Sequence, residues 1–387
     1  MRTAPDIYEI RFSYDYCRNK SQEACGEAGI PFAWADYDDD RALGQILLQI
    51  NGRFLLMAAS PELVLSSAAI KAFLSCPADP YDALGPVFNQ TPLPRQVASL
   101  PGPYLDIASF EEVAHILAQA QGHEMIPVSQ LDPACIFYDV QFLRSLAPSI
   151  PACQLSQSLQ KHRAVRLGVA TGALVHHGFL ENLGSPRDDL VRLVPQGVRQ
   201  VLDIGCARGG YGKALKAANP RIFITGIEQN AVLAAAAAPH YDELIVAPVE
   251  QVRLETPVDL INCGDVLEHL QDPWTLLAQL HALLRPGGYL VMSIPNAGHW
   301  SIVRQLLRGR FEYIPLGPLC IGHVRWFTES SIRRDLQQAG FSIDRLERQQ
   351  APPTPQGDAF IEALCRAMDA DETSLRTNEF IIRAIKA

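Results

Sequence analysis

The chain has 387 residues, of which 48% are hydrophobic and 19% charged, and its 33 basic and 42 acidic residues give a formal net charge of −9. This length is enough for two or three domains, each with its own core. The excess of acidic residues argues against a nucleic acid as the main partner. The nine cysteines are scattered and never spaced Cys-x-x-Cys, which indicates reduced thiols rather than a disulfide framework or a structural zinc site.

The start of the chain and its apolar runs predict neither a targeting signal nor a membrane span. The first residues, MRTAPDIYEIRF, lack the apolar core of a signal peptide. The longest purely apolar run, AVLAAAAA at 231–238, is too short to cross a bilayer. We therefore expect a cytoplasmic protein.

The first half of the chain has a mixed pattern that ends in a loop-rich region. DIYEIRFSYD (6–15) and RFLLMAASPELVL (53–65) are typical of strands, and the acidic run YDDD (37–40) is typical of a solvated turn. Residues 146–160 are rich in Pro, Ser and Gln without a clear period, and 182–189 is again loop-like. We expect one domain at 1–180 and a second at 190–387.

From residue 198 onward, strand-like and helix-like stretches alternate, and APPTPQGD (351–358) is the one further loop singled out. Strands are expected at 199–205, 221–229, 243–248, 258–266, 287–295, 341–349 and 378–387, and helices at 209–220, 231–238, 272–286 and 330–340. This alternation predicts a parallel sheet with helices on both faces. In such a sheet, ligands bind beyond the carboxyl ends of the strands.

A glycine-rich turn, VLDIGCARGGYGKAL (201–215), follows the first of these strands. Its Gly205 and Gly209 allow the backbone to approach a ligand closely. A dinucleotide fingerprint would have a second glycine where Ala207 stands, so Asp-x-Gly-x-Gly-x-Gly, starting at Asp203, fits better. Glu228 ends the next strand, where a carboxylate can accept hydrogen bonds from both ribose hydroxyls of an adenosine ligand.

Two further stretches, CGDVLEHLQDP (263–273) and LRPGGYLVMSIPN (284–296), complete a recognisable set. Together with the glycine-rich turn they resemble the class I S-adenosylmethionine-dependent methyltransferases over residues 190–387. The resemblance implies a Rossmann-like α/β fold with a seven-stranded sheet and S-adenosyl-L-methionine as cofactor. It also implies a cofactor site: Asp203, Gly205, Cys206, Ala207 and Gly209 at the methionine end, Glu228 at the ribose, Gln229 and Val249 at the adenine, and Asp265 and Val266 near the methyl group and acceptor.

Pro248 departs from the family pattern, because many members have an aspartate there that binds the adenine amino group. Adenine contact is then expected from a backbone group or from apolar packing.

A hydroxyl acceptor would need a base, and histidine suits that task near neutral pH. Three histidines follow the ends of strands, namely His269, His299 and His323. His323 is the first choice as base, with lid packing or substrate orientation as its alternative role, whereas His269 is expected to fix the turn after its strand. No metal ion is expected, because Asp, Glu and Asn ligands are not clustered in the sequence.

An insertion at 297–330 separates the fifth strand from the next helix. Insertions at this edge of a sheet form lids over the acceptor, and this one resembles a subset of methyltransferases that act on sugars or small metabolites. Its residues Arg310, Phe311 and Tyr313 are expected either to contact the acceptor or to anchor the lid.

The stretch NGRFLLMAASPELVLSSAAIKAFLS (51–75), followed by GPVFNQ and PYLDIASFEEVA, resembles the centre of GT-A, family 2-like glycosyltransferases over 40–180. Where that family has an acidic metal-binding motif, this chain reads Ala59-Ser60-Pro61-Glu62, with one carboxylate instead of two. A divalent ion on a sugar diphosphate needs clustered oxygen ligands. His176 and His177 are read as a residual metal site or as packing residues. We therefore expect a smaller α/β domain, a truncated and degenerate glycosyltransferase that binds the acceptor or mediates assembly.

The predicted function is O-methylation of a sugar, glycoconjugate or small metabolite, with a small-molecule or glycan acceptor and no nucleic acid partner. Four alternatives stay open: methylation of a peptide, methylation of a natural product, a bifunctional glycosyltransferase and methyltransferase, and a non-catalytic module that binds S-adenosylmethionine and assembles partners. A homo-oligomer is also left open.

Overall fold

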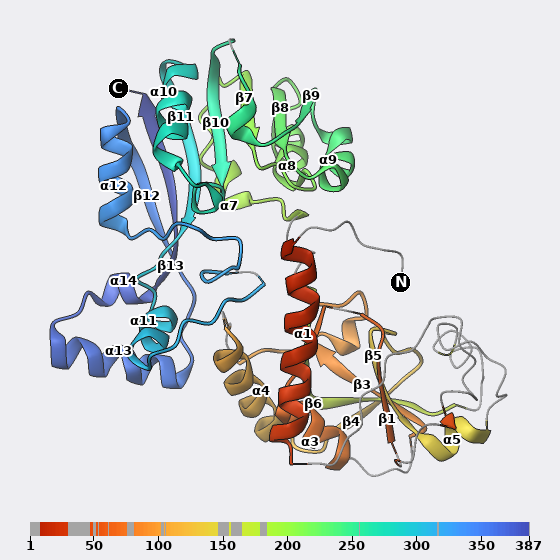
Figure 1. Cartoon of the computed structure of the whole chain (residues 1–387). Helices are drawn as coiled ribbons and strands as arrows, with labels where there is room; N and C mark the ends of the chain where they lie inside the picture. The colour runs from red at the N-terminus through yellow and green to blue at the C-terminus, as the bar shows by residue number, and fades with distance from the viewer. Residues whose placement is uncertain are drawn as a thin grey trace. The chain divides into compact units, whose positions relative to one another are not determined.

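The computed structural model divides by its internal contacts into two compact units, Met1–Phe179 and Leu180–Ala387 (Figure 1). No described helix combines the length and the hydropathy that crossing a membrane requires. The structure describes residues 8–29, 47–48, 52, 54–60, 62–75, 81–101, 104, 106–145, 155, 165–178, 184–254, 256–315 and 317–386. The acidic run at 37–40 lies outside the described residues.

The first unit contains a mixed six-stranded sheet in the order β1-β5-β3-β6-β2, with β4 also paired to β6. Only β3 and β6 run parallel, and the other described pairs are antiparallel. The strands are β1 (Phe54–Ala58), β2 (Leu63–Leu65), β3 (Ala83–Phe88), β4 (Met125–Val128), β5 (Cys135–Asp139) and β6 (Leu167–His177). The helices are α1 (Tyr8–Glu27), α3 (Ser67–Ser75), α4 (Ile107–Gln121) and α5 (Val140–Ser145), with a 3-10 turn η1 (Pro94–Gln96).

Both faces of this sheet are covered by buried apolar side chains. Successive strand residues point to opposite faces, so Ile136 and Phe137 belong to different clusters. Helix α4 contributes Phe110 to one cluster, and α3 contributes Phe73 to the other. The N-terminus of α4 is fixed by a capping box, in which Asp106 accepts from the backbone of the third helical residue. The smaller α/β domain expected from the sequence is thus built on a mixed sheet.

The strand predicted at 6–15 is wrong, because these residues begin helix α1 from Tyr8 onward. Short alternation of apolar residues in DIYEIRF suggests a strand, but the pattern over the whole segment is helical. Among the residues with described side chains, Tyr16, Cys17, Ser21 and Ala24 are buried, and they repeat at helical spacing along one face. The strands predicted within 53–65 are present as β1 and β2.

The second unit has a seven-stranded sheet in the order β12-β13-β11-β10-β7-β8-β9 (Figure 1). The pairs from β11 to β9 run parallel, whereas β13 is antiparallel to both of its neighbours. The seven-stranded sheet predicted from the sequence is therefore present, but the expectation that it is parallel throughout is wrong. The strands are β7 (Gln200–Ile204), β8 (Phe223–Glu228), β9 (Glu243–Val246), β10 (Val258–Gly264), β11 (Leu284–Pro295), β12 (Phe341–Gln350) and β13 (Thr377–Lys386).

The predicted helices of the second unit are present, and three further helices, at 300–307, 355–368 and 372–376, were missed. Residues 355–358, expected as loop, begin a helix in which Pro355 occupies the first turn and Thr354 accepts from the Gly357 amide. The helices are α7 (Asp188–Val191), α8 (Gly210–Ala218), α9 (Ala231–Ala237), α10 (Pro273–Leu283), α11 (Trp300–Leu307), α12 (Glu329–Gln338), α13 (Pro355–Met368) and α14 (Glu372–Arg376), with 3-10 turns η4 (Ala238–His240), η5 (Val249–Gln251) and η6 (Leu267–His269).

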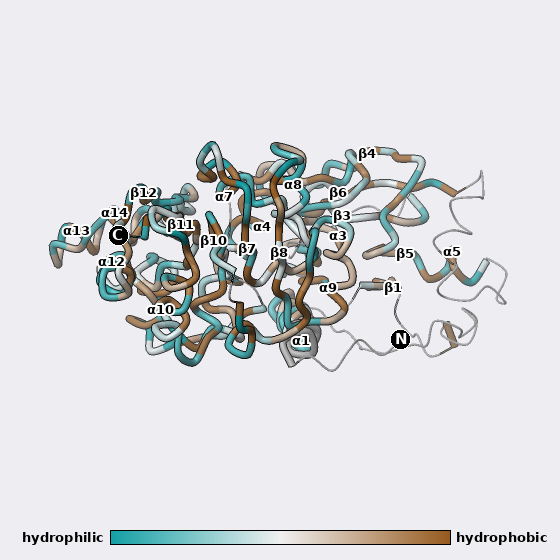
Figure 2. Tube along the Cα trace, turned by 90° about the horizontal axis from the view of Figure 1, so that it is seen from above, coloured by the Kyte–Doolittle hydropathy of each residue, from teal (hydrophilic) through white to brown (hydrophobic). Residues whose placement is uncertain are grey.

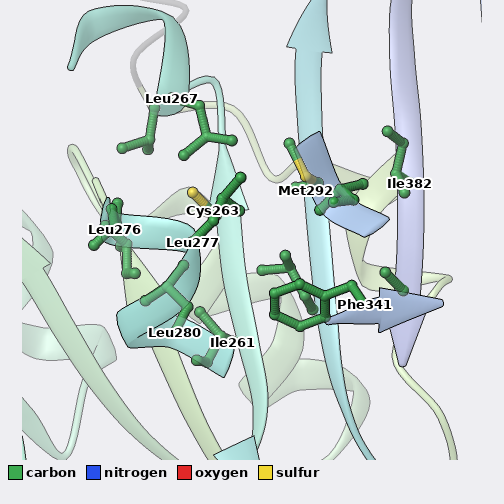
Figure 3. Close-up of a cluster of buried hydrophobic side chains, with 14 of the residues drawn as sticks. Ile261, Cys263, Leu267, Leu276, Leu277, Leu280, Met292, Phe341 and Ile382 are labelled. Atoms are coloured by element: carbon green, nitrogen blue, oxygen red, sulfur yellow. The ribbon is translucent and has the colours of Figure 1, made fainter. Parts of the chain in front are cut away.

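The main core of the second unit lies between the sheet and helices α10 and α12 (Figure 3). Leu277 of α10 is 1% exposed and packs in one cluster with Ile261 of β10 and Met292 of β11. The tube view shows the central strands β7 and β8 as hydrophobic over much of their length (Figure 2). A smaller cluster joins Trp300 of α11, which lies in the predicted lid insertion, to Ile361 of α13 and Leu375 of α14.

Replacing Leu277 by alanine should lower the free energy of unfolding by about 2–5 kcal/mol, since it removes buried methyl groups and leaves a cavity. Leu306→Ala is the matched control, because Leu306 is 54% exposed, and it should change stability by less than about 0.5 kcal/mol. Urea denaturation followed by tryptophan fluorescence would measure both. Equal effects of the two substitutions would contradict the assignment of Leu277 to the core.

Candidate active site at the carboxyl edge of the second sheet

The carboxyl ends of β7, β8 and β10 meet at one edge of the second sheet. In register, Asp203 of β7 pairs with Gly226 of β8 on one side and Asn262 of β10 on the other. The chain leaves β7 through the glycine-rich turn, and the amides of Gly205 and Cys206 both donate to the carbonyl of Ile227, at 2.9 and 3.1 Å. The turn is therefore held against the end of β8.

The turn uses backbone conformations that glycine adopts most easily. Gly205 has φ +69° and Gly209 has φ +82°, and a Cβ on Gly205 would lie 2.8 Å from Cγ2 of Val266. Ala207 has φ 46°, a left-handed conformation that costs a non-glycine residue about 1–2 kcal/mol. The predicted tight turn is thus strained at Ala207. Cys206 is buried, and burial raises the pKa of its thiol.

Glu228 ties the turn to the start of the next helix. Its Oε2 accepts from the Ala207 amide at 2.9 Å and its Oε1 accepts from the Asn230 amide at 2.8 Å. A carboxylate offers about four acceptor positions, so two backbone bonds leave each oxygen able to accept one more. This donor set fits an adenosine-bearing cofactor, because two neighbouring ribose hydroxyls need two acceptors of this kind.

Asp203 is buried beneath the turn rather than open to it. Its carboxylate accepts from the Tyr241 hydroxyl at 2.5 Å and from the Asn262 amide at 2.7 Å. Burial raises its pKa to about 6, although both hydrogen bonds favour the ionised form. The Tyr241 hydroxyl also accepts from the Gly212 amide in the first turn of α8, at 3.2 Å. Asp203 thus joins β7, β10 and α8 through these two partners.

Asp265 begins the loop after β10 with a positive φ of 53°. It accepts from the Ser293 hydroxyl at 2.8 Å and forms an ion pair with Arg187. The same guanidinium lies 2.9 Å from carboxylate oxygens of Asp189 and Glu379. Burial and the nearby Asp265 raise the pKa of Glu379 to about 8. Several acidic side chains therefore surround one arginine at this strand end.

The two residues predicted at the adenine lie at the ends of neighbouring strands. Gln229 follows β8 and is exposed, and Val249 begins η5 after β9 and is half-buried. Val249 also lines an apolar cavity of about 330 Å³, together with Ile204, Ile227 and Leu276. The sequence predicts that a backbone group or apolar side chains contact the adenine, because Pro248 replaces an aspartate. One of the apolar side chains of this cavity, Val249, directly follows Pro248 in the chain.

The structure separates the three predicted histidines by environment. His299 is 1% exposed and is the N-cap of α11, with its Nδ1 2.9 Å from the Ser301 hydroxyl, which are the contacts of a helix cap. His269 is exposed in η6, and His323 is buried beside it, with ring centroids 4.8 Å apart. Burial lowers the pKa of His323 to about 4, which makes it a weak base.

The predicted lid insertion carries a group of half-exposed aromatic rings. The ring of Phe311 lies 5.4 Å from that of Tyr313 and 5.6 Å from that of Trp326, edge to face in both cases. Each ring is about two-fifths exposed. The sequence analysis named Phe311 and Tyr313. The third ring, Trp326, lies in the segment that follows His323.

Residues 176–346 match a family model described as a methyltransferase domain. A methyltransferase domain therefore lies in this part of the chain. The sequence prediction of a methyltransferase with S-adenosylmethionine as its cofactor is confirmed at the level of this domain. The resemblance of the first unit to glycosyltransferases has no such support and stays a prediction.

Three curated relatives match parts of the same region. Trans-aconitate 2-methyltransferase of Klebsiella pneumoniae (strain 342) is 38% identical over 142 residues, which cover 33% of this chain and 55% of the relative. Ubiquinone biosynthesis O-methyltransferase of Pseudomonas aeruginosa (strain LESB58) is 34% identical, covering 25% and 45%. tRNA 5-carboxymethoxyuridine methyltransferase of Escherichia coli (strain K12) is 44% identical over 64 residues, covering 16% and 24%. The chain thus spans about half, or less, of the length of these relatives.

Among solved structures, an S-adenosylmethionine-dependent methyltransferase from Mesorhizobium loti is similar at 20% sequence identity. The similarity covers 52% of this chain and 98% of that chain, with a TM-score of 0.37.

Sequence reasoning missed the side chains that hold the site together. Arg187 lies in a segment expected only as a loop, with φ 49°, and Glu379 lies in β13, far along the chain. Tyr241 and Asn262 likewise show no local pattern that marks them as partners of Asp203. The alternation of apolar residues locates strand ends, but it does not tell which polar side chains meet there.

Tyr241→Phe removes a donor to a buried carboxylate and should cost about 1–3 kcal/mol of stability near pH 8. An unfolded aspartate has a pKa of about 3.9. Because the folded pKa of Asp203 is about 6, the native state binds more protons between these values, and stability falls as the pH rises through them. Losing the tyrosine donor raises the folded pKa further, so the cost should be smaller near pH 5.

Denaturation at both pH values would measure this difference, with Tyr313→Phe as the control at a half-exposed position. A cost that is the same at both pH values would refute the coupling between Tyr241 and Asp203.

Proposed function

We propose that the chain is an S-adenosylmethionine-dependent O-methyltransferase that acts on a small metabolite, with sugars and glycoconjugates included among its acceptors. The observation that carries this proposal is Glu228, whose two oxygens hold the glycine-rich turn and keep acceptor positions for a ribose. When bound, S-adenosylmethionine supplies an electrophilic methyl group. Two similar proteins, a trans-aconitate 2-methyltransferase and a ubiquinone biosynthesis O-methyltransferase, support a small acceptor.

In this proposal each segment of the carboxyl edge has its own task. Gly205, Cys206, Ala207 and Gly209 shape the backbone around the methionine end, with Asp203 fixing the turn from below. Gln229 and Val249 flank the adenine. Asp265 and Val266, which follow β10, lie toward the methyl group and acceptor. Most of the catalysis then comes from positioning and from exclusion of water.

The insertion at 297–330 is proposed as the lid over the acceptor. Its aromatic group of Phe311, Tyr313 and Trp326 is exposed, so these rings are free to pack on an apolar part of the substrate. Arg310 next to them would attract an acidic acceptor. The net charge of −9 argues against a nucleic acid substrate, although one matched relative carries tRNA in its name.

The proposed role of the first unit (residues 1–180) is acceptor binding or assembly, and its glycosyltransferase-like character remains a prediction. Ser60 and Glu62 lie beside the end of β6, where the hydroxyl of Ser60 is 3.1 Å from Nε2 of His177. His176 pairs with the Tyr104 hydroxyl at 2.8 Å, and burial lowers its pKa to about 4. These contacts favour the packing role over a residual metal site. A homo-oligomer and a cytoplasmic location belong to the same proposal.

Glu228→Ala should weaken binding of S-adenosylmethionine by roughly 100-fold, because hydrogen bonds to a charged group are each worth about 1.5–3 kcal/mol. Isothermal titration calorimetry would measure the dissociation constant. Glu228→Gln, which preserves the side-chain shape, should lose less affinity for S-adenosylmethionine than Glu228→Ala. Glu243→Ala on the exposed edge strand β9 is the matched control and should bind the cofactor as the native chain does. Unchanged affinity in both Glu228 variants would show that the ribose lies elsewhere.

A cell extract incubated with the protein and methyl-labelled S-adenosylmethionine should yield a labelled small molecule that mass spectrometry can identify. The label should be absent with Glu228→Ala and present with Glu243→Ala. Tight cofactor binding without any labelled product would instead favour a non-catalytic module. A label found only on peptides or RNA would contradict the proposed acceptor class.

A further inference from the structure

Glu268 is a buried carboxylate without a hydrogen-bond partner among the described residues. It is 1% exposed, and neither Oε1 nor Oε2 has a hydrogen bond. Leaving an ionised carboxylate buried and unpaired costs several kcal/mol, so such groups pair, lose their charge or bind a metal ion.

Two histidines lie beside this carboxylate, and backbone contacts determine which ring nitrogen of each one is protonated. Nδ1 of His269 lies 3.1 Å from the carbonyl oxygen of Gly322, and Nδ1 of His323 lies 3.1 Å from that of Pro318. A carbonyl only accepts, so each Nδ1 carries the proton and each Nε2 of the neutral ring has a lone pair. Histidines that bind metal ions are oriented in this way, with one nitrogen donating to a backbone carbonyl and the other on the metal.

The three side chains come from segments that backbone hydrogen bonds hold together. The carbonyl of Glu268 accepts from the amides of Val324 and Arg325, at 2.8 and 3.0 Å, which fixes His323 next to η6. One ligand atom from each of Glu268, His269 and His323 lies within 4.8 Å of the other two. Nε2 of His323 is 4.0 Å from Oε1 of Glu268, too far for a hydrogen bond between them.

We propose that Glu268, His269 and His323 bind a divalent first-row transition-metal ion, through one carboxylate oxygen and the two Nε2 atoms. A set of two imidazoles and one carboxylate suits zinc, manganese or iron rather than calcium or magnesium, which prefer oxygen ligands. In a tetrahedral zinc site, ligand atoms about 2.1 Å from the ion lie about 3.4 Å apart. The ligand atoms here lie within 4.8 Å of one another, so binding of the ion would draw them closer together.

Three protein ligands leave coordination positions open for water or another oxygen. The site lies in the same loop as Asp265, which follows β10. An acceptor oxygen on the ion would have a lowered pKa and would need no strong base. That role depends on the proposed methyl transfer, whereas binding of the ion does not. The expectation that the chain has no metal ion considered Asp, Glu and Asn clusters only and is revised by this inference.

Full-length protein stripped with a chelator should bind one Mn²⁺ per chain, seen as loss of the free-ion signal in electron paramagnetic resonance. Manganese is the main probe, because free thiols in the chain compete for zinc. Glu268→Gln and His269→Ala should each weaken Mn²⁺ binding by tenfold or more. The second variant alters an exposed side chain, so it tests the site even if the first fails to fold. His115→Ala, an exposed histidine in α4, is the matched control and should bind as the native chain does.

The metal site and the cofactor site can be tested independently. Glu228→Ala should bind Mn²⁺ with native affinity and stoichiometry in the absence of S-adenosylmethionine. Absence of Mn²⁺ binding to the native chain, or binding that both His269→Ala and Glu268→Gln leave intact, would overturn the metal site. Either result would leave the proposed methyltransferase function standing.

Discussion

Burial of carboxylates at the carboxyl edge of a seven-stranded sheet is the constraint on which the second unit depends. Each acid at this edge is matched to a different kind of partner, and two of them, Asp203 and Glu228, are buried. Asp203 has a hydroxyl and an amide, Glu228 has two backbone N–H groups, and Asp265 and Glu379 share one guanidinium. These partners come from β10 and from the segments before β7, after β7, after β8 and before β9, so satisfying the acids also fixes the positions of the loops. Glu268 is buried as well but has no hydrogen-bond partner among the described residues, and the proposed metal ion rests on this difference.

The sheet of the second unit could be predicted from the sequence because local patterns determine it. Apolar runs of strand length, each followed by a turn and a helix, mark β7, β8, β10 and β11, and the positions of Gly205 and Glu228 follow from where these strands end. The direction of β13 could not be predicted, because an antiparallel strand has the same composition as a parallel one. Helix α1 was misread because a short apolar alternation resembles a strand until the longer helical repeat is considered.

Much of the site could not be predicted, because its contacts join residues far apart in the chain. Arg187 and Glu379 are separated by nearly the whole second unit, and no local period links them. His323 is held next to Glu268 by hydrogen bonds from the Val324 and Arg325 amides to the Glu268 carbonyl, a contact between residues more than fifty positions apart. The sequence named all three histidines, but their distinct roles follow from burial and from the carbonyl oxygens that orient their rings.

The antiparallel placement of β13 has a consequence for synthesis of the chain. Strand β12 hydrogen-bonds to β13 and to no other described strand, and β13 separates it from β11. Until residues 377–386 have left the ribosome, β11 therefore presents an open edge and β12 has no neighbour. The glycine-rich turn and Glu228 can form earlier, since β7, β8 and β10 are already complete. A nascent chain would thus form the glycine-rich turn before its sheet is complete, and needs protection of the β11 edge in that interval.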